Sequence, residues 1–117
     1  MGKSILKDKS YALAIAIVKI VQLIQKEQKE YFLRKQILRS GTAIGALISE
    51  AEFGQSKADF IHKLTISSKE ANETKYWLNL LHDTHYLEKK FFVELSANCA
   101  ELIKMFVSSI NTSKSSL

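Results

Sequence analysis

The chain has 117 residues with no proline and only four glycines, so it predicts one domain rich in helix, because few residues interrupt helices. Its 17 basic and 12 acidic residues give a net charge of +5, which attracts polyanions such as nucleic acid or an anionic membrane surface. The single cysteine, Cys99, excludes an internal disulfide and favours the reducing cytoplasm.

The first predicted helix spans about residues 10–28. Its apolar run is interrupted by Lys19 and Gln22, so we interpret it as a core helix and not as a signal peptide or membrane span. Ile15 lies one turn before Lys19, on the polar side, and this extra apolar surface predicts an intersubunit contact. The core positions recur at spacings of four, three and four: Leu13, Ile17, Ile20 and Ile24.

The second predicted helix spans about residues 31–53. Gly41 and Gly45 lie one turn apart on one face and predict close approach of another helix; the alternative is a flat backbone surface for a ligand or phosphate. Gly54 is expected to end the helix. The apolar face consists of Leu33, Ile37, Ile44, Leu47, Ile48 and Ala51.

The third predicted helix spans about residues 56–82 and begins with a capping box, in which Ser56 and Asp59 satisfy first-turn amides. A turn follows at about residues 83–90. The core positions alternate spacings of four and three, which favours long antiparallel packing. They are Phe60, Leu64, Ser67, Ala71, Thr74, Leu78 and Leu81.

The fourth predicted helix spans about residues 91–111, with the core positions Phe92, Leu95, Cys99, Leu102, Phe106 and Ser109. Residues 1–9 and 112–117 are expected to be loosely ordered. Helices of this length with short connections pack as antiparallel neighbours. The sequence therefore predicts an all-α, up-down-up-down four-helix bundle that forms a single domain over residues 1–117.

Three motifs lie between Ser40 and Leu81. SGTAIGALISEA stands at Ser40–Ala51, SKADFIHK at Ser56–Lys63 and KEANETKYWLNLL at Lys69–Leu81. On these motifs, the chain resembles the 23S rRNA-intervening-sequence proteins, a bacterial family also called the four helix bundle protein family. The resemblance extends over about residues 11–87.

The resemblance implies a homopentamer of four-helix bundles around an axial channel. The accessory variability determinant proteins of diversity-generating retroelements are related, and they form a basic pentameric barrel that binds nucleic acid and a reverse transcriptase. Leu47 stands where the family pattern has asparagine, Ala43 where it has serine and Ser49 where it has glutamate. The second helix is therefore less polar here, and no role of that asparagine is carried over.

Basic residues gather around the connection between the first and second helices, with Tyr31 and Phe32 among them. Basic groups beside aromatic rings suit phosphate contact and base stacking. Glu27 and Glu30 partly neutralise this charge, so a solvated helix end is the alternative. The candidate nucleic-acid-binding residues are Lys26, Lys29, Arg34, Lys35 and Arg39.

Other charged residues predict structural ion pairs. Glu50, Glu70 and Glu73 are candidates to pair with Arg39 across the bundle. Pairs within the third helix are expected to stabilise its surface only slightly. They are Asp59–Lys63 and Lys69–Glu73.

The sequence predicts no catalytic site, metal site or cofactor. His82 and His85 are too few for a metal site, and no Glu-x-x-His motif accompanies them; a position near a helix C-terminus explains them more simply. Cys99 lies on the core seam and is expected to be a buried structural thiol, not a nucleophile.

The sequence thus predicts a cytoplasmic, non-enzymatic homo-oligomer, a pentamer by resemblance, that binds nucleic acid through basic surface residues. RNA is favoured over DNA, and no membrane partner is expected. The alternative is an assembly or adaptor protein whose partner is another protein, because the first helix and the region around Trp77 carry surplus apolar surface.

Overall fold

The computed structural model describes residues 2–27 and 29–116, with side chains from residue 5 onward in those ranges. Within them the chain forms four helices and no strand, which confirms the all-α prediction. The helices are α1 (Gly2–Glu27), α2 (Phe32–Ala51), α3 (Lys57–Asp83) and α4 (Lys89–Ser115).

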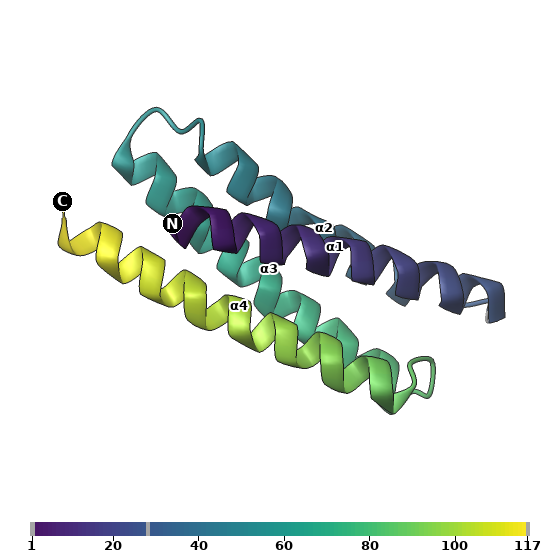
Figure 1. Ribbon diagram of the computed structural model, residues 1–117. Coiled ribbons are helices and arrows are strands. Elements are labelled where there is room, and N and C mark those ends of the chain that lie inside the picture. The colour runs from purple at the N-terminus through teal and green to yellow at the C-terminus, as the bar shows by residue number, and fades with distance from the viewer. Residues whose placement is uncertain (1, 28, 117) are drawn as a thin grey trace.

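The helices pack as an antiparallel, up-down-up-down bundle with extents of 48 × 22 × 19 Å. Each helix packs against its neighbours in the chain, and α4 closes the bundle against α1 through the smallest of the four contacts. Figure 1 shows the α1–α2 and α3–α4 connections at one end, and the α2–α3 connection at the other end with both chain ends.

The core lies along the predicted seams. In α3, Leu64, Ala71 and Leu78 are at most 1% exposed. The four core positions predicted for the first helix are also buried, and so are four of the six predicted for the fourth. Ser109 and Phe92 are only partly buried. The alternation of three and four residues therefore identifies the buried face of each helix correctly.

Both ends of the chain contain more helix than the sequence predicts. The prediction that α1 begins near Ser10 is wrong, because Leu6 and Ser10 are buried and continue the core spacing of four and three toward the N-terminus. Ser10 is polar, which hid this repeat, but its Oγ donates to the carbonyl oxygen of Lys7 at 3.0 Å. At the C-terminal end of the chain, α4 continues to Ser115, so the expected fraying from residue 112 is also wrong. Residues 1 and 117 lie outside the described residues.

The α2–α3 seam contains small polar residues that are fully buried. Thr74 Oγ1 and Ser40 Oγ share a hydrogen bond of 2.9 Å, and Ser67 Oγ donates to the carbonyl oxygen of Ile44 at 2.9 Å. These three side chains are 0% exposed. Because buried hydroxyl groups need partners, the bonds favour one register between the two helices.

Gly41 and Gly45 face α1, which confirms the prediction that another helix approaches them closely. A Cβ atom at Gly41 would lie 3.0 Å from Cγ1 and Cγ2 of Ile17, which is a clash with a buried branched side chain. A Cβ atom at Gly45 would lie 3.4 Å from Oγ of Ser10, which is an ordinary contact. Of these two glycines, only Gly41 is therefore required by packing.

Gly54 does not end α2 as predicted. The helix ends at Ala51, and no glycine among the described residues has a positive φ. A Cβ atom at Gly54 would lie 3.1 Å from the backbone carbonyl oxygen of Ala51 and 2.9 Å from Oδ2 of Asp59, so close approach of the backbone favours glycine here. Ser56 caps α3 as predicted, because its Oγ accepts from the amide of Asp59 at 3.1 Å.

Replacement by alanine should change the free energy of unfolding in opposite directions at the two glycines of α2. Gly41→Ala should lower the free energy of unfolding by about 1 kcal/mol, because overpacking against Ile17 outweighs the gain in helix propensity. Gly45→Ala should raise it by up to about 1 kcal/mol, because the propensity gain meets no clash. Urea unfolding at equal protein concentration measures both, and a stabilised Gly41→Ala protein would contradict the packing argument.

Candidate nucleic-acid interface

The five predicted basic residues lie around the α1–α2 connection and the first turns of α2. Lys26, Lys29 and Lys35 are exposed, and among the described residues none of the three forms an ion pair. Arg34 is only 6% exposed, and Arg39 is half exposed. The structure thus divides the set into three available cations and two engaged ones.

Arg34 holds the α1–α2 connection together. Its Nε donates to the carbonyl oxygen of Glu30, and its guanidinium carbon lies 4.8 Å from the centre of the Tyr31 ring. The Glu30 carboxylate accepts from the amides of Leu33, at 2.6 Å, and of Arg34, at 3.3 Å. It therefore satisfies amides of the first turn of α2, which have no helical partner. This placement does not support the prediction that Arg34 contacts phosphate.

Arg39 links α2 to α3, as the predicted pairing with Glu70 and Glu73 required. Its Nη1 lies 3.3 Å from Oε1 of Glu70, and its Nη2 donates to Oε2 of Glu73. The same oxygen of Glu73 accepts from Nε1 of Trp77 at 2.8 Å. One carboxylate thus joins a cation of α2 to the indole of α3.

Three of the predicted ion pairs are wrong, and two of these errors follow from spacing within one helix. Lys63 lies 3.2 Å from Glu50 of α2 and not beside Asp59, so Glu50 does not pair with Arg39 either. Glu73 is engaged by Arg39 and not by Lys69. Packing of α2 against α3 brings these partners closer than neighbours on one helix surface.

An exposed aromatic platform, which consists of Phe32, Tyr76 and Trp77, lies where α2 meets α3. The ring centres of Phe32 and Trp77 are 6.3 Å apart with an interplanar angle of 81°, and those of Tyr76 and Trp77 are 5.0 Å apart at 77°. Phe32 is 63% exposed and Tyr76 is 59% exposed. The sequence does not predict this grouping of three rings. Its one signal is that Tyr76 and Trp77 are consecutive, and two adjacent residues of a helix cannot both face the core.

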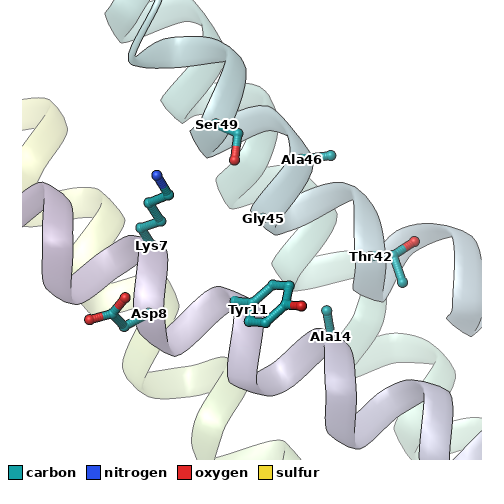
Figure 2. Close-up of a pocket in the computed structure, with 8 residues that line it drawn as sticks. All are labelled: Lys7, Asp8, Tyr11, Ala14, Thr42, Gly45, Ala46 and Ser49. Carbon is teal, nitrogen blue, oxygen red and sulfur yellow. The ribbon is translucent and has the colours of Figure 1, made fainter.

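A groove of about 560 Å³ lies between α1 and α2. Figure 2 shows Lys7 and Tyr11 extending from α1 beside the bare backbone of Gly45. Tyr11 is 67% exposed, and Ile15, one turn further along α1, is 42% exposed. The predicted surplus of apolar surface on the first helix is therefore confirmed. The groove is lined by Lys7, Asp8, Tyr11, Ala14, Thr42, Gly45, Ala46 and Ser49.

Two of the three histidines, His82 and His85, lie around the α3–α4 turn, and Cys99 lies in the core. The His82 ring stacks on Phe92 with centres 4.3 Å apart, and His85 adopts a φ of 69° in the α3–α4 turn. Cys99 is 0% exposed; burial raises the pKa of its thiol to about 12, and the positive charge of Lys75 opposes this rise. Across the described residues, no three His, Cys, Asp or Glu side chains form a group that could hold a metal ion.

The model of the 23S rRNA-intervening sequence protein family matches residues 3–108. The chain belongs to this family. The resemblance drawn from the three motifs is therefore confirmed.

The fold is also similar to a crystal structure from Bacteroides thetaiotaomicron, of a protein with unknown function from the S23 ribosomal protein family. The TM-score is 0.92 and the sequence identity is 48%, over 95% of this chain and 99% of that chain. No curated protein matches the chain. In the described part of this family member, no helix is long and apolar enough to cross a membrane.

The buried thiol predicts a dependence of stability on pH. Because the pKa of Cys99 rises from its ordinary value of 9.0 to about 12 on folding, the native state holds this proton more tightly than the unfolded chain. The resulting stabilisation is complete below pH 9.0 and is lost as pH rises toward 12. The slope is at most about 1.4 kcal/mol per pH unit.

Urea unfolding of the wild type and of Cys99→Ala across this pH range measures the effect. Lysines and tyrosines titrate in both proteins, so the difference between the two free energies isolates the thiol. A difference that does not change with pH would contradict the prediction.

Proposed function

We propose that this family member is a non-enzymatic, cytoplasmic homo-oligomer that binds nucleic acid, RNA in preference to DNA. The observation that carries the proposal is the exposed lysine group Lys26, Lys29 and Lys35 beside the exposed rings of Tyr31 and Phe32. Lysines without a carboxylate partner are available to phosphate, and binding to phosphate releases counterions. RNA is favoured because the family name refers to 23S rRNA and the structural neighbour belongs to a family named for a ribosomal protein.

Self-association through the outer face of α1 supports the same function. Tyr11 and Ile15 present apolar surface to water beside a groove of about 560 Å³, and a second copy would cover it. A ring of copies, a pentamer by family resemblance, repeats the lysine group around one assembly. Weak phosphate contacts then act together and gain avidity.

A second candidate function is an adaptor whose partner is a different protein. The same α1–α2 groove favours it, because helix-binding grooves of protein partners are commonly apolar. This candidate needs no phosphate contact, so nucleic-acid titrations distinguish it from the first.

Removal of two lysines should weaken RNA binding and its dependence on salt. Lys29→Ala/Lys35→Ala is expected to reduce the slope of log affinity against log salt by about 2. The matched control, Lys104→Ala/Lys114→Ala, removes two exposed charges from α4 and should leave the slope nearly unchanged. Fluorescence anisotropy with labelled RNA over a range of salt concentrations measures both.

Two results would overturn the nucleic-acid proposal. One is the absence of RNA and DNA binding by the wild type even at low salt. The other is an equal effect of the test and control variants, because binding would then depend on net charge alone.

A charge on the outer face of α1 should disrupt the assembly. Ile15→Lys is expected to lower the solution mass toward that of a monomer, since an apolar contact would bury an unpaired cation. Val107→Lys is the control, because Val107 is 50% exposed on α4. Light scattering coupled to size exclusion measures the mass, and a monomeric wild type would contradict self-association.

A further inference from the structure

We propose that the aromatic platform stacks unpaired bases, so that this protein selects single-stranded nucleic acid over duplex. This inference rests on the proposed nucleic-acid binding and adds the class of strand that is bound. The platform adjoins the lysine group, because Lys35 follows Phe32 by one turn of α2. A strand whose phosphates meet these lysines can therefore present its bases to the rings.

Trp77, the ring that the other two contact, is anchored to the bundle. Trp77 is partly buried and packs against the core, and its Nε1 donates to Glu73 at 2.8 Å. Glu73 is held in turn by Arg39. Rings that are fixed before binding lose little conformational entropy when a base stacks on them.

Two rings of the platform are open to a stacking partner. Phe32 and Tyr76 keep more than half of their surface in water while they contact the edges or faces of Trp77. Bases stack on such rings whatever their sequence, because every base has a π face. In a duplex those faces are already stacked on neighbouring bases, so only unpaired bases can use the platform.

Charge around the platform suits a polyanion. Glu70 and Glu73 are both bound by Arg39, which reduces their repulsion of phosphate. Lys35 on α2 and Lys69 on α3 are exposed, and Lys69 precedes Tyr76 by seven residues, or two turns on the same face. Cations therefore lie on both helices that carry the rings, as they do in grooves that track a single strand.

The test compares a short oligouridylate with the same strand annealed to oligoadenylate. Wild type should bind the single strand more tightly, and the single strand alone should quench Trp77, the only tryptophan of the chain. Tyr76→Ala should weaken single-strand binding about tenfold and leave duplex binding unchanged, whereas Tyr76→Phe should retain binding. Phe53→Ala is the matched control, because Phe53 is 85% exposed and follows the C-terminal end of α2, whereas the platform lies at the first turn of α2.

The outcomes separate this inference from the proposed function. If single strand and duplex bind equally and only Lys29→Ala/Lys35→Ala weakens both, phosphate binding stands and base stacking is overturned. If neither probe binds, the proposed function itself fails. If Tyr76→Ala lowers the solution mass, the platform is a subunit contact, and the stacking proposal is overturned as well.

Discussion

The register between α2 and α3 is the constraint on which the candidate site depends. Small buried hydroxyl side chains bring the two helices together, and the Thr74–Ser40 hydrogen bond joins them at 2.9 Å. This register places Arg39 against Glu70 and Glu73. It also brings Phe32 of α2 to Trp77 of α3. A slip of one turn would break these contacts together, because each joins a residue of α2 to a residue of α3.

The two sides of the bundle differ in how completely their surfaces are closed. The α2–α3 side is closed by hydrogen bonds and ion pairs, and it displays rings and cations at its surface. The α1 side is less complete, because α1 makes its smallest contact with α4 and leaves Tyr11 and Ile15 in water. Self-association through Tyr11 and Ile15 of α1 and base stacking on the platform of α2 and α3 would therefore use separate surfaces, so that a ring can form without covering the platform.

The close approach of α1 and α2 at Gly41 and Gly45 could be predicted only in part from the sequence. Two glycines one turn apart in a helix predict close approach of a neighbour, and Gly41 confirms it with a clash at 3.0 Å. The sequence does not tell which glycine is required, since that depends on whether Ile17 or Ser10 lies opposite. Ser10 also concealed the first part of α1, because a polar residue at a core position resembles the end of the apolar repeat.

The spacing of apolar residues by itself determined the four helices and their buried faces, because burial of one stripe per helix dominates the energetics of a bundle. The motifs determined the family. Tertiary structure alone decided which charges pair between helices: Glu50 of α2 meets Lys63 of α3, and Arg39 of α2 is engaged by α3. Ion pairs and ring contacts between helices depend on distances that arise only once the helices are packed. The sequence therefore does not show which of the five predicted cations remain available, and it does not assemble the aromatic platform.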